Sequence, residues 1–312
     1  MQTVPRGAAP ILVVGRSGQL ATDLVAAGRR AGVAVAALGR PELDLADADA
    51  VARALDRTRP AAVVNAAAYT AVDRAESEPD LAAAVNRDGP AALAARCARA
   101  RIPLVHVSTD QVFDGRKAGG YVEADPPNPL CVYGRSKLAG ERAVAQMHDN
   151  ALIVRVSWVF GPSGDNFVTK VLGWARTRDR IAIVCDQRGR PTYGPALADA
   201  LIALAARMVA GGAGRPRGLL HLAGASPMTR DAQARAILAA AARRGARCAE
   251  VVPVPTCDFP TAAARPLNAE LDPTLAAERH GIRLGPFADD PEATLDRLVG
   301  QRAERFPPVN HS

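Results

Sequence analysis

The sequence predicts an α/β protein, a doubly wound parallel sheet followed by a smaller and more irregular C-terminal lobe. Short apolar runs alternate with longer Ala- and Arg-rich helical stretches from residue 11 onward, which is typical of parallel strands with helices on both faces. A pair of glycines follows the first apolar run, and the alternation loosens after residue 157. The length of 312 residues corresponds to about two domains, or to one elaborate α/β domain.

Seven apolar runs are predicted strands, and helical stretches fill the gaps between the first five. Because parallel strands need a crossover connection, these elements predict a first lobe over residues 1–157, with part of 181–222 returning to its sheet. No repeat of fixed period is present. The predicted strands are 11–14, 33–38, 61–66, 103–108, 151–156, 181–184 and 219–222, and the predicted helices are 18–31, 47–58, 80–100 and 133–147.

The remaining residues, 158–312, are predicted to form mainly the second lobe. They contain the turn-rich segments GPSGDN, QRGRPTYGP and GGAGRPRG, and seven prolines lie between Pro253 and Pro291. Since proline interrupts helices, long continuous helices are not expected in that last part. We expect this lobe to close over the carboxyl edge of the sheet, where open α/β sheets bind ligands.

Composition excludes several classes of protein. The net charge of +7 comes almost wholly from arginine, but the arginines are scattered among acids and aromatic residues make up only 4%, so no nucleic-acid partner is predicted. No apolar run reaches the ~18 residues of a membrane span, and the start MQTVPRGAAP lacks a signal-peptide pattern. No membrane association and a cytoplasmic location are therefore expected. A reducing compartment without a metal or disulfide framework also fits the five cysteines, none in a C-x-x-C pair: Cys97, Cys131, Cys185, Cys248 and Cys257.

The first predicted strand leads into a glycine-rich turn that suits a dinucleotide. Gly15 and Gly18, with Ala21, follow the spacing G-x-x-G-x-x-A at the start of a helix. The helix N-terminus offers free N–H groups to a pyrophosphate, and glycines let it approach the backbone. A simple strand-to-helix turn is the alternative, but the position after the first strand of a βαβ series favours a Rossmann cofactor site.

The end of the second strand bears on the choice of cofactor. Gly39-Arg40 stands where NAD-binding proteins carry an acid for the ribose 2′-hydroxyl. Arg40 instead offers a cation for a 2′-phosphate, which favours NADPH over NADH, unless it is simply a solvated arginine. Asp44 and Leu45 follow and are candidates for contact with the adenine, although Asp44 would equally suit a cap for the next helix.

Tyr133 and Lys137 form the candidate catalytic pair. Four residues apart in a helix, they project from one face. The ammonium group then stabilises the phenolate, so that tyrosine can act as acid or base nearer neutral pH. Thr109 ends the fourth strand, where its hydroxyl can bind a substrate carbonyl oxygen. Coincidence is the alternative, yet the chain has only three lysines.

Several segments resemble the extended short-chain dehydrogenase/reductases, and within them the dTDP-4-dehydrorhamnose reductase family. The resemblance implies a catalytic triad of Thr109, Tyr133 and Lys137. Family positions that bind the sugar nucleotide correspond to Thr109, Asp110, Tyr133 and Trp158, although Trp158 would otherwise be read as a core residue. The implied cofactor contacts are Gly18, Gln19, Leu20, Asp44, Leu45, Ala68, Tyr69 and Thr70. The segments, in family order, are GRSGQL, VNAAAYTAVDRAE, STDQVFDG, VYGRSKLAGE, RVSWVF, DQRGRPT and RPLNAELD.

The resemblance implies NADPH- or NADH-dependent reduction of the C4 keto group of dTDP-4-dehydro-L-rhamnose. Arg265 is a candidate for the pyrophosphate of that substrate. Gln111 departs from the family, which usually has tyrosine there, so a reductase of another nucleotide-linked 4-keto-6-deoxyhexose is an alternative. A non-catalytic, NADP-binding regulatory subunit is another. Some family members form homodimers, in certain cases bridged by magnesium, but no magnesium or other metal ligands can be assigned in this sequence.

Overall fold

The central sheet of the computed structural model has six parallel strands. The structure describes residues 9–287 and 294–296, so the start of the chain and Pro291 lie outside the described residues. The strand order is β10-β5-β4-β3-β1-β2. From β1 the chain adds β2 on one side and then β3, β4 and β5 on the other, so the order of the strands reverses between β1 and β3. Doubly wound sheets open a ligand crevice at such a point. The strands are β1 (Ile11–Val14), β2 (Val35–Leu38), β3 (Ala62–Asn65), β4 (Leu104–Thr109), β5 (Ala151–Val156) and β10 (Gly218–Leu222).

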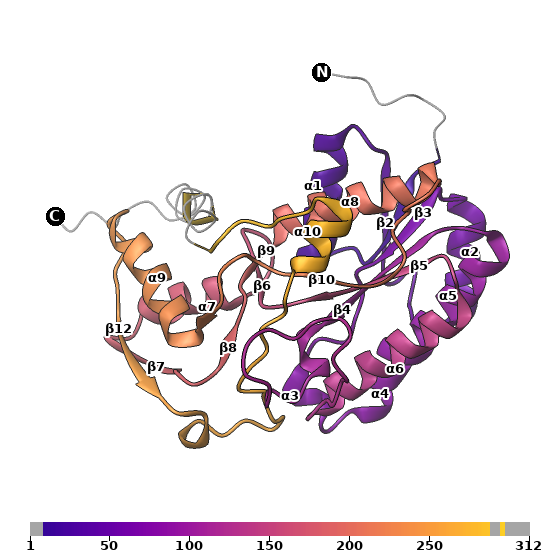
Figure 1. The fold of residues 1–312 in the computed structure, drawn as a ribbon. Helices are drawn as coiled ribbons and strands as arrows, with labels where there is room; N and C mark the ends of the chain where they lie inside the picture. The colour runs from indigo at the N-terminus through magenta and orange to yellow at the C-terminus, as the bar shows by residue number, and fades with distance from the viewer. Residues whose placement is uncertain (1–8, 288–293, 297–312) are drawn as a thin grey trace.

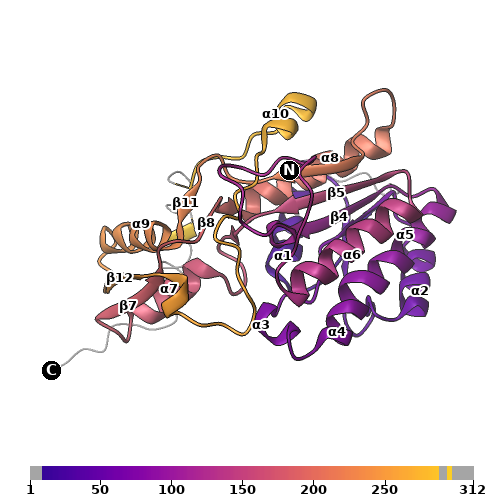
Figure 2. The ribbon, with the colours of Figure 1, turned by 60° about the horizontal axis from the view of Figure 1, so that its bottom comes forward.

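Helices cover both faces of the sheet (Figures 1 and 2). α1 (Gln19–Ala31) and α8 (Gly194–Ala210) pack on one face with Ile11 and Val13, whereas α2 (Ala48–Thr58), α5 (Gly89–Ala100) and α6 (Val132–Met147) pack on the other with Leu12 and Val14. Strands buried on both faces read as continuous apolar runs. The predicted doubly wound sheet is therefore confirmed.

The predicted helix 80–100 is interrupted. α3 (Val72–Ala75) and α4 (Pro79–Ala83) lead into a π-helical turn (Ala84–Asp88), and α5 follows. In that turn the buried Asn86 accepts a hydrogen bond from Tyr69 N at 2.8 Å and donates to Ser136 Oγ at 3.0 Å. The π turn thus ties the segment after β3 to α6, and π turns of this kind are frequent at functional sites.

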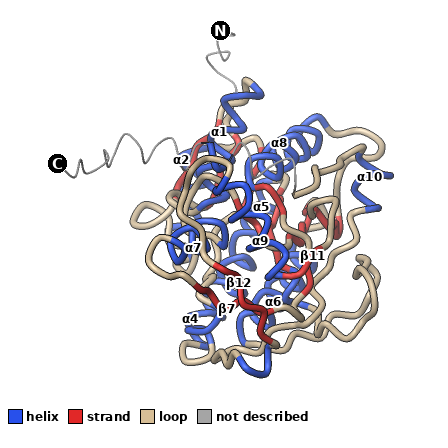
Figure 3. Tube along the Cα trace, turned by 90° about the vertical axis from the view of Figure 1, so that its left-hand side faces the viewer, coloured by secondary structure: helices blue, strands red, loops and turns tan. Residues whose placement is uncertain are grey.

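The C-terminal lobe has its own core, built around Phe160, Ile181 and Ile237. Figure 3 views the molecule from the side of this lobe, with β7 (Arg180–Val184), β12 (Glu250–Val254), α7 (Phe167–Ala175) and α9 (Arg230–Ala242) toward the viewer. β7 pairs with β12, so the run 181–184 builds this lobe whereas 219–222 joins the central sheet. The exact boundary of the lobes stays a prediction. Shorter elements are β6 (Val159–Phe160), β8 (Arg188–Gly189), β9 (Thr192–Tyr193), β11 (Met228–Thr229), α10 (Thr274–His280) and the 3-10 turns Asp110–Val112 and Thr256–Asp258.

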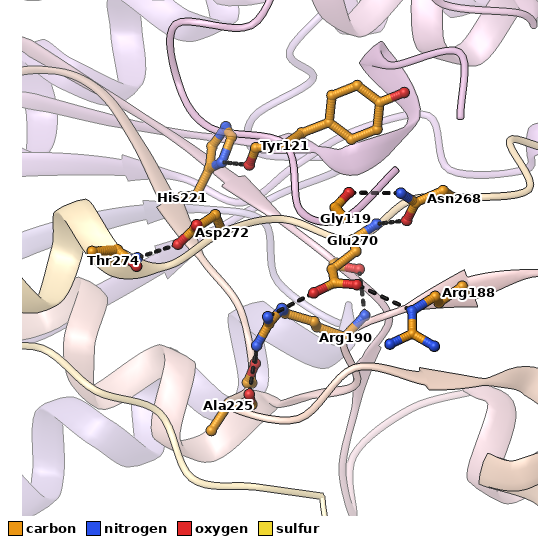
Figure 4. A network of polar contacts seen from close by, with 12 residues as sticks. Gly119, Tyr121, Arg188, Arg190, His221, Ala225, Asn268, Glu270, Asp272 and Thr274 are labelled. Atoms are coloured by element: carbon orange, nitrogen blue, oxygen red, sulfur yellow. Dashed lines mark hydrogen bonds and ion pairs between the residues drawn. The ribbon is translucent and has the colours of Figure 1, made fainter. Parts of the chain in front are cut away.

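The segment RPLNAELD fastens the two lobes together (Figure 4). Asn268 Nδ2 donates to the carbonyl oxygens of Lys117 and Gly119, both at 2.7 Å. The Glu270 carboxylate accepts from Arg188 at 3.2 Å and from Arg190 at 2.7 Å. Charge-assisted bonds of this type are among the stronger ones in proteins, so the polar residues of this motif hold the C-terminal lobe against the loop that follows β4.

Candidate functional site

A cavity of about 1140 Å³ lies at the carboxyl edge of the sheet. Its lining comes from the segments after β1, β2, β3 and β4, from α6 and from the C-terminal lobe. It brings together every predicted site residue except Arg265: Gly15, Gly18, Gln19, Leu20, Arg40, Asp44, Leu45, Ala68, Tyr69, Thr70, Thr109, Asp110, Tyr133, Lys137 and Trp158.

The turn after β1 has the form that a pyrophosphate requires. Gly15 has φ of 125°, a conformation that side chains rarely adopt, and a Cβ there would lie 3.3 Å from Ala21 Cβ. Gly18 is the N-cap of α1, no side chain caps the helix, and a Cβ at Gly18 would meet nothing within 4 Å. Open N–H groups at a helix N-terminus fit the diphosphate of a dinucleotide.

The turn after β2 presents arginines at the rim of the cavity. Arg16 Nη1 is paired with Glu42 at 2.8 Å. Arg40 is exposed at the rim and has no ion-pair partner among the described residues. Asp44 Oδ1 accepts from Ala46 N at 3.0 Å, whereas Asp47 caps α2. The alternative reading of Asp44 as the helix cap is therefore wrong.

Tyr133 and Lys137 lie on α6, one turn apart and both buried. Lys137 Nζ donates to Val107 O at 2.8 Å, and burial lowers the pKa of Lys137 to about 8, against an opposing effect of Glu141. Burial raises the pKa of Tyr133 above its usual value, while the Thr109 hydroxyl counteracts it by hydrogen bonding. Without ligand the tyrosine is thus fully protonated and suited to donate a proton.

Asp110 anchors the hydroxyl groups beside the tyrosine. Its carboxylate accepts from Thr109 Oγ1 at 2.9 Å and from Ser157 Oγ at 2.8 Å, and it is 4% exposed. Burial raises the pKa of Asp110 to about 6, although both hydroxyl groups oppose the shift. Ser157 and the acid therefore fix the rotamer of Thr109 at the end of β4.

Trp158 lines the cavity rather than the core. Its backbone has φ of 47°, and its indole ring lies between Gly189 and the guanidinium of Arg230, whose Cζ is 3.3 Å from the ring centroid. Cation–π stacking of this kind is favourable by about 0.5–2 kcal/mol. Trp158 therefore lies in the cavity with its ring against Arg230, and its role as an apolar face for a sugar stays a prediction.

Arg230 is a cleft residue that no sequence pattern indicated. It opens α9, lines the cavity, and has no ion-pair partner among the described residues; its side chain donates to Gln233 Oε1 at 3.0 Å. Burial lowers the pKa of Arg230, and Asp110 opposes the shift. One arginine among 36 has no distinguishing pattern, so only the folded chain shows this cation facing the cleft.

Of two further residues that the sequence singled out, Gln111 lines the cavity and Arg265 does not. Gln111 lines the cavity and its Oε1 lies 3.5 Å from Cys131 Sγ. Arg265 does not line it; its guanidinium pairs with Asp73 at 2.9 Å. Its role toward a pyrophosphate stays a prediction.

The described part of the chain has neither a metal-binding cluster nor a membrane-spanning helix. No group of three or more His, Cys, Asp or Glu side chains is arranged to hold a metal ion. No helix is long and apolar enough to cross a bilayer. Magnesium therefore stays unassigned.

The comparisons with known proteins agree with these features. The model of the RmlD substrate binding domain matches residues 9–299. dTDP-4-dehydrorhamnose reductase of Sinorhizobium fredii is 42% identical over 289 residues, 93% of this chain and 96% of the relative. The enzyme of the same name from Aggregatibacter actinomycetemcomitans is 40% identical, over 88% and 94% of the two chains.

Solved structures show the same likeness. The Bacillus anthracis dTDP-4-dehydrorhamnose reductase in complex with NADP has a TM-score of 0.84 and 29% identity, over 94% of this chain and 99% of that one. The Clostridium acetobutylicum protein of that name has a TM-score of 0.86 and 30% identity, over 93% and 99%. The resemblance that the motifs predicted is thereby confirmed, and the chain belongs to the RmlD family, that of the dTDP-4-dehydrorhamnose reductases.

Proposed function

We propose that this protein reduces the C4 keto group of dTDP-4-dehydro-L-rhamnose to give dTDP-L-rhamnose, with NADPH preferred over NADH. The observation that carries the proposal is the convergence of Thr109, Tyr133 and Lys137 in one cavity with the glycine turn after β1. NADPH fits the residues present, since Gly15 and Gly18 leave room for its diphosphate and Arg40 is free to meet the 2′-phosphate.

Each residue of the triad has a separate task. Bound NADPH would supply the hydride. Thr109, which donates to Asp110 in this structure, would turn its hydroxyl to donate to the keto oxygen. Tyr133 delivers its proton to that oxygen as negative charge develops there. Lys137 holds the ribose of the cofactor and stabilises the phenolate form of Tyr133 after the proton has been transferred. The pKa of Lys137, about 8, still lies above neutral pH, so the ammonium form that stabilises the phenolate prevails there.

The substrate's sugar and diphosphate would meet the C-terminal lobe. Trp158 would offer to the deoxyhexose the part of its indole ring that lines the cavity and that Arg230 leaves uncovered. Arg230, a cation in the cleft without a carboxylate partner among the described residues, suits the diphosphate. With substrate bound, Asp110 keeps the hydrogen bond from Ser157 and can accept one from a sugar hydroxyl in place of that from Thr109.

A turnover assay tests the proposal. Loss of absorbance at the nicotinamide band is followed with NADPH and with NADH, using dTDP-4-dehydro-L-rhamnose as substrate. Tyr133→Phe should lower turnover about 10²–10⁴-fold while leaving NADPH binding nearly unchanged. Full turnover by the phenylalanine variant would exclude Tyr133 as the proton donor.

A second candidate rests on Gln111. An amide replaces an aromatic ring in the cavity, and a Streptomyces niveus protein called dTDP-4-keto-6-deoxy-D-glucose reductase is 41% identical over 194 residues, 62% of this chain and 67% of that relative. Reduction of another 4-keto-6-deoxyhexose nucleotide is therefore the alternative. Comparing kcat/KM for the two substrates separates them. No turnover with either, despite NADPH binding, would favour the regulatory subunit.

The proposal includes a homodimer and a cytoplasmic location. Sedimentation of the purified protein checks the first, and fractionation of cells the second.

A further inference from the structure

Another cavity, of about 830 Å³, lies on the face of the sheet that carries α6. Its floor is apolar and includes Ile153 of β5 and Leu219 of β10, and α6 forms one wall. This cavity shares no lining residue with the main cleft. Its volume falls in the range of small-molecule sites, about 300–1000 Å³.

Three arginines at this cavity have no side-chain partner in the part of the chain that the structure describes. Arg142, Arg217 and Arg279 are exposed, line the cavity, and have no hydrogen-bond or ion-pair partner for their side chains among the described residues. Most of the other arginines that the structure describes have a hydrogen-bond or ion-pair partner, as Arg96 does with Asp56. Three like charges around one hollow repel one another, and an anion between them removes that repulsion.

The acids of the lining do not balance these charges. Glu141 is fully engaged, because both its oxygens accept from the guanidinium of Arg155, at 2.9 and 2.7 Å. Arg155 itself is 2% exposed, and its Nη1 has no hydrogen-bond partner. Asp149 is the remaining acid of the lining, so three unpaired cations face one carboxylate.

We propose that this cavity binds a phosphorylated organic anion, with its phosphate groups at Arg142, Arg217 and Arg279 and its apolar part on the floor. Guanidinium groups bind phosphate in a planar, bidentate manner. The floor of Ile153 and Leu219 suits the base of a nucleotide. The proposal is independent of the reaction assigned to the main cleft.

The Glu141–Arg155 pair must stay intact in any test. Ser108, which lines the main cleft, donates to Glu141 Oε1, so a change in this pair would disturb both cavities. Arg142, Arg217 and Arg279 are free of this difficulty, because their side chains have no hydrogen-bond or ion-pair partner within residues 9–287 and 294–296.

Calorimetric titration of the purified protein, with NADP⁺ at saturation to fill the cofactor site, tests the inference. The probes are inorganic pyrophosphate and ADP. Both should bind the wild type, and loss of two guanidinium groups in Arg142→Gln/Arg279→Gln should weaken binding at least about tenfold. The matched control Arg99→Gln/Arg178→Gln removes two exposed arginines elsewhere and should change nothing. Tighter binding of ADP than of pyrophosphate identifies a nucleotide, and equal binding identifies free phosphate compounds; either supports the site.

The inference is wrong if neither probe binds, or if Arg142→Gln/Arg279→Gln binds the probes as the wild type does. It is also wrong if Arg230→Gln abolishes binding, because the probe would then lie in the main cleft. A dimer that dissociates in the Arg142→Gln/Arg279→Gln variant would assign this face to a second copy of the chain instead. Should that variant melt early, Arg217→Gln replaces it, since Arg217 is also exposed and unpaired.

Discussion

Gly189→Ala tests whether the position of Trp158 controls the reaction. A Cβ at Gly189 would lie 2.4 Å from Cε2 and 2.7 Å from Nε1 of the indole. Carbon atoms in contact stand about 3.5 Å apart, so the ring must retreat by about 1 Å. Arg230 lies against the ring at 3.3 Å, so the retreat has little room.

The displacement should affect the sugar half of the cleft alone. A misplacement of about 1 Å can lower a rate by about 10²-fold, so turnover should fall 10- to 100-fold with a higher KM for the sugar nucleotide. NADPH binding should be unchanged, because Gly189 does not line the cleft and the nearest atoms to an added Cβ all belong to Trp158. Overpacking should also destabilise the lobe by about 1–3 kcal/mol. Steady-state kinetics, NADPH titration and thermal melting measure these effects.

Gly173→Ala is the matched control. Gly173 lies in α7 of the same lobe, is exposed, and a Cβ there would meet nothing within 4 Å. This change should leave kinetics intact and stabilise the helix by about 0.5–1 kcal/mol. Unchanged kinetics in Gly189→Ala would refute the reasoning, since the indole would then be free to move without consequence.

Three further substitutions each remove one charged side chain. Burial raises the pKa of Asp110 in the folded protein to about 6, above its ordinary 3.8. The folded state therefore holds a proton that the unfolded state has lost, and its stability falls by up to about 3 kcal/mol as pH rises from 4 to 7. The melting temperature of Asp110→Asn relative to the wild type should rise over that range, and a constant difference contradicts this. Glu141→Gln should destabilise by about 3–5 kcal/mol in denaturant titration, because it strands the buried Arg155, whereas Glu250→Gln breaks an exposed pair and should change stability by less than about 1 kcal/mol. Arg40→Gln should raise KM for NADPH on the order of tenfold and spare NADH; equal effects on the two cofactors would show that Arg40 does not contact the 2′-phosphate.

The sequence predicted the sheet well because its strands are buried on both faces. The run 11–14 is apolar throughout, and 151–156 is apolar except for Arg155; the structure has the same bounds for β1 and β5. The run 181–184 is equally apolar, but its partner β12 lies about 70 residues further along the chain. An apolar run predicts a strand and cannot predict which sheet it joins.

The relative placement of Tyr133 and Lys137 could be predicted because their spacing determines it. Tyr133 and Lys137 are one turn apart on any helix, so their common face needed no tertiary information. Ser157, Arg230 and Gly189 approach Asp110 and Trp158 through contacts between segments 30 to 120 residues apart. No local pattern marks such residues, and the shaping of the sugar half of the cleft became visible only in the folded chain.

We infer that the buried ion pair of Glu141 and Arg155 positions α6 on the sheet. A buried ion pair loses hydration energy that its attraction does not fully restore, so it is weak evidence for stability. Glu141 lies one turn beyond Lys137 and accepts hydrogen bonds from Arg155 of β5 and Ser108 of β4. These bonds fix the helix against the two strands whose ends carry Thr109 and Ser157. A leucine pair could fill the same space but would let the helix slide, and a slide of 1 Å would separate Tyr133 from Thr109. On this reasoning Glu141→Gln should lose turnover even under conditions in which it is fully folded.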